Sequence, residues 1–171
     1  MPHASAARRL VIPRWARMFW LAAVAVLVAC SSGGISNAPD PIKKALEPFA
    51  QAGYACASAP AGSDNSAFAQ WHCDHTTANG TALHVVVDGD SSHVKQVLAV
   101  IDQSKAPATS AGPAVDFFGR VAAIDLGSSS RDIAVWIPTA IQTGGQQAFG
   151  SVLVTIDALR PVCHLVLFVQ G

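Results

Sequence analysis

Residues 68–102 read FAQWHCDHTTANGTALHVVVDGDSSHVKQVLAVID, and this stretch has the clearest strand pattern of the chain. Side chains alternate between apolar and polar, which is the two-residue period of a half-buried strand. Asn79-Gly80 is the strongest turn signal of the chain, because both residues tolerate the positive φ of a type I′ hairpin turn. The stretch predicts a β-meander with strands over Phe68–His75, Leu83–Val87 and Val94–Asp102.

A helix and a short strand are expected before the meander. Asp40 is a suitable N-cap with Pro41 at the first helical position, and Ile42, Leu46 and Phe49 follow on one face. Gly53 is a natural C-terminal stop, and Tyr54 to Ser58 reads as a strand. Pro48 lies one turn from the end and predicts a kink or a short helix.

Helices and two further strands are expected after the meander. Pro113 to Leu126 has a helical apolar stripe, and Asp116 and Arg120 form an i, i+4 ion pair on its flank. Ser130 to Gln142 has helical spacing, but Pro138 leaves a strand open as an alternative. Two apolar strands close the chain, Phe149–Ile156 and Val162–Val169. The last is apolar on both faces, which predicts a central place in the sheet.

This order of elements predicts an α+β fold. We expect a single antiparallel β-sheet of about six strands, with two or three helices packed on one face.

The N-terminus has the three parts of an export signal. Four arginines precede an apolar run from Met18 to Ala29, which is too short to span a bilayer as a helix. Leu27-Val28-Ala29-Cys30 ends this run and resembles the lipobox of bacterial lipoproteins. The resemblance covers only these 30 residues. It implies a thioether-linked diacylglycerol on Cys30, cleavage before it and acylation of the new amine.

Three segments follow from this resemblance. Residues 1–29 are a cleaved lipoprotein signal peptide, 30–38 a lipidated flexible tether, and 39–171 a single α+β domain. Two or more acyl chains anchor a protein stably, so the expected partner is the membrane itself. The chain is then held in a bacterial cell envelope, at the outer face of the cytoplasmic membrane or at the outer membrane.

Removal of the signal changes the charge. The full chain is neutral, but the part after Cys30 has seven Lys and Arg against eleven Asp and Glu, a net charge of −4. An acidic domain of this kind lacks the basic patch that nucleic-acid binding requires, so we expect no nucleic-acid partner.

Three cysteines remain after lipidation of Cys30. An exported domain meets oxidising chemistry, so a disulfide is expected. Three cysteines allow three single pairings, and we favour Cys56–Cys73 because these two lie on adjacent predicted strands. Cys163, in an apolar strand, is expected to stay a buried free thiol.

Motifs for catalysis and cofactor binding are absent. The sequence has no G-x-S-x-G, G-x-G-x-x-G, P-loop or C-x-x-C motif, and Glu47 is its only glutamate. We therefore expect no cofactor and assign no catalytic residue. A Ser-His-Asp triad assembled in space stays open as an alternative, as in a small hydrolase.

The Trp71-His72-Cys73-Asp74-His75 run is the densest polar cluster. Imidazole and thiolate suit zinc or copper, but strand alternation puts His72 and Asp74 on one face and Cys73 and His75 on the other. A two-ligand metal site from His72 and His84, on one hairpin face, is the remaining metal alternative.

Two further features of the sequence are weaker candidates for a binding site. Asp88-Gly89-Asp90-Ser91-Ser92 offers clustered oxygens, but it lacks the glycine and glutamate of an EF-hand and reads as a turn. Trp71 and Trp136 are candidates for lining a ligand groove, although core packing explains both more simply. The sequence as a whole predicts an envelope-anchored, non-catalytic binding or assembly module.

Overall fold

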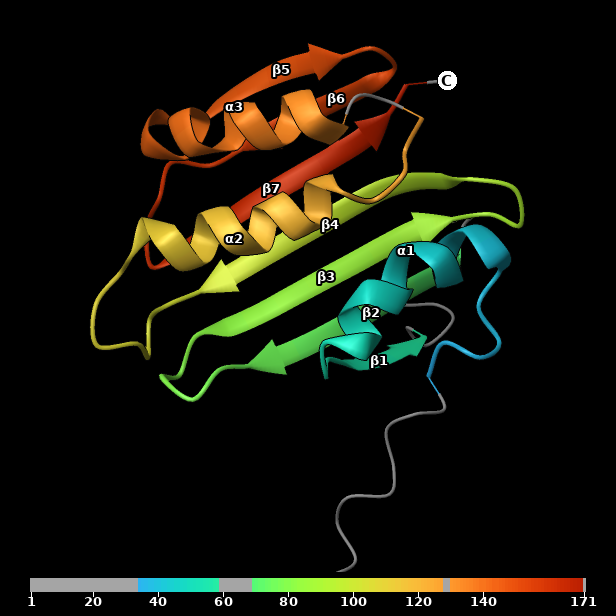
Figure 1. The fold of residues 1–171 in the computed structure, drawn as a ribbon, viewed down its shortest axis with the longest axis horizontal. Coiled ribbons are helices and arrows are strands. Elements are labelled where there is room, and N and C mark those ends of the chain that lie inside the picture. Colours follow the sequence, from blue (N-terminus) through green and yellow to red (C-terminus); the bar gives the residue numbers. More distant parts are fainter. Residues whose placement is uncertain (1–33, 59–68, 128–129, 171) are drawn as a thin grey trace, which may run out of the picture. The chain divides into compact units, whose positions relative to one another are not determined.

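A seven-stranded antiparallel sheet forms one layer, and three helices cover one of its faces (Figure 1). The computed structural model describes residues 34–58, 69–127 and 130–170. In chain order the elements are α1 (Asp40–Gln51), β1 (Ala55–Ser58), β2 (Ala69–Thr76), β3 (Ala82–Gly89), β4 (Val94–Asp102), α2 (Ala111–Ala122), α3 (Ser130–Thr143), β5 (Gly145–Phe149), β6 (Val152–Ile156) and β7 (Val162–Val169).

The sheet confirms the predicted α+β class. Its strand order is β1-β2-β3-β4-β7-β6-β5, so the chain meanders through β4, crosses over through α2 and α3, and returns along the far edge. The described strands number seven rather than about six because an additional edge strand, β5, precedes the turn at Gly150, so that the run expected as one strand, Phe149–Ile156, begins at the end of β5. Gly150 has a φ of +60°, which glycine adopts without steric cost. The last strand, β7, is an interior strand between β4 and β6.

Strand alternation sets which side chains enter the core. Trp71 and Cys73 of β2 pair with Val87 and Val85 of β3, and all four side chains are buried beneath the helices. The intervening side chains, including His72 and His84, lie on the opposite face of the sheet and are partly exposed. The predicted division of the polar run between two faces is therefore confirmed.

The first helix begins one residue earlier than its sequence suggests. Pro39 is the N-cap and makes no side-chain cap bond, so Asp40 is the first helical residue rather than the cap. Its carboxylate lies in the first turn, where the helix dipole favours a negative charge. The helix continues past Pro48 to Gln51 because Pro48 is exposed, which leaves the unpaired carbonyl one turn back accessible to water. Gly53 ends it with a φ of +85°.

Residues 130–143 are a helix, which settles the alternative left open by Pro138. Ile133, Ile137 and Ile141 share a buried face, while Pro138 lies on the exposed side of the helix. The carbonyl that Pro138 leaves without a donor therefore faces solvent rather than the core.

The first hairpin turn differs from the expected two-residue type. The N–H of Gly80 donates to the carbonyl of Thr77 at 3.0 Å, so Gly80 is the fourth residue of the turn and has a φ of +87°. Thr77 and Thr81 close the loop with further backbone and hydroxyl bonds. The loop therefore runs from Thr77 to Thr81, because the hydrogen bonds between these two threonines close it outside Asn79-Gly80.

The packed unit extends to residues before α1. Ala38 is buried, Ile35 packs against the core, and a Cβ built on Gly34 would come within 1.5 Å of the carbonyl oxygen of Cys56. These residues lie in the segment that we expected to act as a tether. Residues 31–171 form one compact unit of their own, so a chain that begins at Ser31 keeps the whole core.

Candidate functional site

A groove with a volume of about 1000 Å³ lies between α1 and α2. α2 packs closely on α3, whereas α1 packs mainly on β1 to β4, and a strip of the sheet lies between α1 and α2 (Figure 1). A groove of this size is large enough for a drug-sized ligand. We call it the α1–α2 groove.

Apolar side chains from four parts of the chain line most of this groove. They come from α1, from the start of β4, from the segment that follows α2 and from the end of β7. The apolar lining residues are Pro41, Ala45, Pro48, Phe49, Val94, Ala123, Ile124, Leu126 and Val169.

Charged side chains lie along the same groove. Lys44, Lys95 and Arg120 line it, together with Asp40 and Asp125. Three of the seven cationic residues that follow Cys30 are therefore gathered here, against two of the eleven acidic ones. The groove is thus richer in positive charge than the domain as a whole.

Two of these cations already have a carboxylate partner. Lys44 Nζ lies 3.5 Å from Asp125 Oδ2, which joins α1 to the segment after α2. Lys95 Nζ lies 3.8 Å from Asp90 Oδ2. Both pairs are exposed, and exposed pairs of this kind contribute roughly 0–1 kcal/mol to stability.

Arg120 has no such partner among the residues that the structure describes. The i, i+4 ion pair expected between Asp116 and Arg120 is not formed, so that prediction was wrong. Both side chains are exposed on the solvent side of α2, where little is gained by ordering two long side chains. The guanidinium of Arg120 keeps its donors available.

A second, smaller hollow of about 200 Å³ shares Arg120 with the groove. Its polar lining comes from Tyr54, His75, Thr77 and Asp116. The rings of Tyr54 and His75 stack with centroids 4.8 Å apart. Burial raises the pKa of the Tyr54 hydroxyl, and the positive charge of Arg120 partly offsets this rise. The hydroxyl therefore stays protonated at neutral pH.

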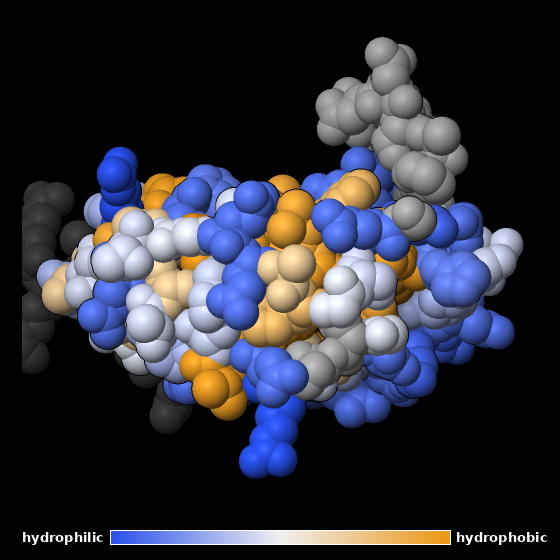
Figure 2. Space-filling view, turned by 90° about the horizontal axis from the view of Figure 1, so that it is seen from above, coloured by the Kyte–Doolittle hydropathy of each residue, from blue (hydrophilic) through white to orange (hydrophobic). Residues whose placement is uncertain are grey.

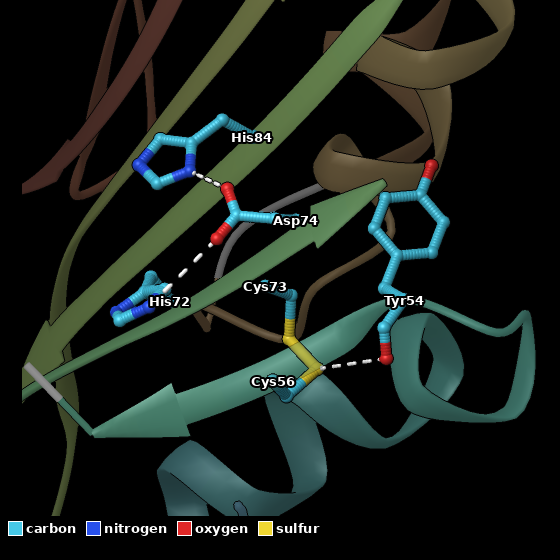
Figure 3. Close-up of polar contacts among 6 residues, drawn as sticks. All are labelled: Tyr54, Cys56, His72, Cys73, Asp74 and His84. Carbon is cyan, nitrogen blue, oxygen red and sulfur yellow. Dashed lines mark hydrogen bonds and ion pairs between the residues drawn. A yellow bond between two sulfur atoms is a disulfide. The ribbon is translucent and has the colours of Figure 1, made fainter. Parts of the chain in front are cut away.

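The metal alternative rests on His72 and His84, which lie on the sheet face opposite the helices. Their ring centroids are 6.0 Å apart, and Asp74 lies between them (Figure 3). Asp74 is hydrogen-bonded to Nδ1 of His84, and its other oxygen lies 3.7 Å from Nε2 of His72. No group of three or more His, Cys, Asp or Glu side chains suited to a metal ion occurs within residues 34–58, 69–127 and 130–170.

A second histidine–aspartate pair lies on the same open face of the sheet. His164 Nδ1 is 2.7 Å from Asp157 Oδ2, and His164 is two strands away from His84, with Val100 between them. Each pair has the histidine and the carboxylate of a hydrolase triad. In the described part of the chain, neither histidine has a serine hydrogen-bonded to it.

Of the remaining sequence candidates, only Ser92 of the 88–92 run lines the groove. Trp71 is buried in the core, and Trp136 packs edge-to-face on Phe149 with centroids 5.8 Å apart. Neither lines the groove. Asp88 and Gly89 end β3, so only the later part of the 88–92 run is a turn, in which Asp90 accepts hydrogen bonds from the N–H groups of Ser92 and His93.

The cysteines divide as the sequence predicts. Cys56 and Cys73 form a disulfide between β1 and β2, and Cys163 is a buried free thiol (Figure 3). Burial raises the pKa of Cys163 to about 11, and the nearby Asp157 carboxylate adds to the rise. Cys30 lies outside the described residues.

Sequence reasoning missed the groove itself. Its lining comes from segments up to about 130 residues apart, and no local motif marks them. The nearest signal was Arg120 on the flank of its helix, which we had paired with Asp116.

Comparison with known proteins gives no match: no protein-family model, no curated protein and no solved structure is significantly similar to this chain. Within the described residues, no helix is both long enough and apolar enough to cross a membrane.

Proposed function

We propose that this protein is a lipid-anchored, non-catalytic binding protein of a bacterial envelope, and that the α1–α2 groove takes up an apolar small molecule. The observation that carries the proposal is the groove: about 1000 Å³, lined largely by apolar side chains. Pockets of this size with a few placed polar groups are the usual form of small-molecule sites.

The anchor is the second part of the proposal. The lipobox-like Leu27-Val28-Ala29-Cys30 would attach the chain through acyl groups on Cys30. Gly34 already packs on the carbonyl of Cys56, so only residues 31–33 separate Cys30 from the packed unit. Three residues extend to roughly 10–11 Å at most. The domain would therefore stay close to the membrane surface, where apolar molecules are concentrated.

Exposed hydrophobic surface elsewhere on the domain fits a second, weaker role in assembly. Hydrophobic patches interrupt the hydrophilic surface at the end that carries α3 and β5 (Figure 2). Val135 of α3 is 72% exposed. A patch of this kind suits contact with another envelope component, in agreement with the binding or assembly module expected from the sequence.

The test uses a neutral apolar dye, N-phenyl-1-naphthylamine, and the chain from Ser31 onward, produced under oxidising conditions. Dye fluorescence should rise on binding and saturate at one site. Ala123→Phe fills the groove from an exposed position and should abolish the rise. Ala148→Phe places the same side chain at an exposed position of β5 outside the groove and should leave the rise unchanged. Equal dye binding by both variants would contradict the proposal.

A further inference from the structure

We infer that the ligand of the α1–α2 groove is an anionic amphiphile, whose acid group binds the guanidinium of Arg120 while its apolar chain lies along the groove. This inference rests on the proposed function and adds the chemical class of the ligand.

The distribution of charge is the first observation. The part of the chain after Cys30 has a net charge of −4, yet three of its seven cations line this one groove. An acidic protein that gathers its cations at an apolar groove is complementary to a ligand with an apolar body and a negative group.

The second observation is that Arg120 alone of the three cations lacks an ion-pair partner within the described residues. Lys44 and Lys95 pair with Asp125 and Asp90, whereas Asp116, one helical turn from Arg120, does not pair with it. A guanidinium presents a fork of donors that fits a carboxylate or a phosphate with two parallel hydrogen bonds. Arg120 therefore has both the charge and the free donors that an acid group requires.

The place of Arg120 is the third observation. It lines both the large apolar groove and the small hollow, whose other polar residues are Tyr54, His75, Thr77 and the solvent-exposed Asp116. An acid group at Arg120 would have the polar groups of the small hollow on one side and room for an apolar chain on the other. This is the arrangement that an amphiphile needs.

The two acidic residues of the groove do not oppose such a ligand strongly. Asp125 pairs with Lys44 at 3.5 Å. Asp40 lies in the first turn of α1, where the positive end of the helix dipole compensates its charge. Arg120 itself lies in the last turn of α2, where a cation is favoured.

The experiment measures displacement of N-phenyl-1-naphthylamine from the chain that begins at Ser31, below the micelle-forming concentration of each competitor. Dodecanoate, dodecyl phosphate and 1-dodecanol share one chain length and differ in the head group, and inorganic phosphate tests the acid group without a chain. We expect both acids to displace the dye at a concentration about tenfold lower than 1-dodecanol. Inorganic phosphate should displace none.

The variants identify the residue. The preference for the acids is the ratio of the displacing concentration of 1-dodecanol to that of each acid. Arg120→Gln should reduce this ratio to about one and should have little effect on displacement by 1-dodecanol. Arg131→Gln removes an exposed arginine of α3 outside the groove and should leave the preference unchanged. Raised salt should reduce the preference of the original chain but not that of Arg120→Gln.

The two possible failures are distinguishable. Dye that binds and is displaced equally by dodecanoate and 1-dodecanol, or a preference that survives Arg120→Gln, overturns the inference and leaves the proposed function standing. If inorganic phosphate displaces the dye at the same concentration as dodecyl phosphate, the ligand is a simple anion, and the inference of an amphiphile is overturned. A chain that binds no dye at all contradicts the proposed function itself.

Discussion

Cys56 and Cys73 face each other directly across β1 and β2, with their Cα atoms 4.0 Å apart. β1 is a four-residue edge strand whose side chains, except that of Cys56, are exposed. The disulfide therefore joins the edge of the sheet to its interior, and it closes a loop with a sequence separation of 17.

Loss of this disulfide should cost about 3 kcal/mol of unfolding free energy, because the crosslink restricts the unfolded chain. Urea titration of the paired variant Cys56→Ala with Cys73→Ala measures the loss. Dithiothreitol should destabilise the original chain by a similar amount and leave the variant unchanged. An original chain that is indifferent to dithiothreitol would show that the crosslink contributes nothing.

Cys163 should be unreactive in the folded protein. Its side chain is fully buried, its S–H donates to the carbonyl of Asp157 at 3.3 Å, and its pKa is raised to about 11, so little thiolate exists near pH 8. Mass spectrometry should find no N-ethylmaleimide adduct under native conditions and one adduct in urea. Rapid native labelling would contradict the burial.

Stability should fall in mild acid partly through two turn aspartates. Backbone N–H groups of Ser92 and His93 lower the pKa of Asp90 below 3.8, and Ser104 lowers that of Asp102. A carboxyl with a lowered folded pKa stabilises the fold fully above its unfolded pKa, and this contribution is lost as the pH falls through the folded pKa.

The check compares urea midpoints at about pH 5 and about pH 3. The double variant Asp90→Asn with Asp102→Asn keeps a hydrogen-bond-accepting oxygen at each position but has no carboxyl group there to titrate. It should therefore lose less stability than the original chain between these two pH values. An equal loss would assign the acid sensitivity to other groups.

Membrane attachment should depend on Cys30. Cys30→Ala should abolish fractionation of the processed form with membranes, because the lipobox-like motif requires the thiol for diacylglycerol transfer. A Cys30 variant that is still processed and stays on membranes after a salt wash would show that another feature anchors the chain.

Zinc should bind only weakly to the open face of the sheet. Within the described residues, no group of three or more His, Cys, Asp or Glu side chains is arranged to hold a metal ion, so His72 and His84 offer only a two-histidine site. Calorimetry should find no one-to-one site tighter than roughly 1 μM. A tighter site that His72→Ala removes would restore the metal alternative.

Local patterns were sufficient to predict most of the fold. The alternation of side chains along residues 68–102 placed Cys73 and His72 on opposite faces of the sheet. This placement predicted both the disulfide and the face of the sheet that is buried. The prediction worked because alternation in a one-sided sheet depends only on neighbouring residues.

The sequence did not predict features that depend on which side chains the folded chain exposes to solvent. GQQAF, residues 145–149, has exposed side chains and no alternation, so the edge strand β5 was not recognised before Gly150. Pro138 left the state of α3 undecided, because only the fold shows that its side of the helix faces solvent. The groove depends on the gap between α1 and α2, which no local pattern encodes.

Chemical-shift mapping tests whether apolar molecules bind in the α1–α2 groove. The chain from Ser31 onward, labelled with nitrogen-15, is titrated with N-phenyl-1-naphthylamine and followed amide by amide. We predict shifts concentrated in α1, in residues 92–95, at Arg120 and in residues 123–127, the segments that supply most of the groove lining. Shifts confined to the open sheet face around Val100 and His164, or no saturable shifts at all, would contradict the account.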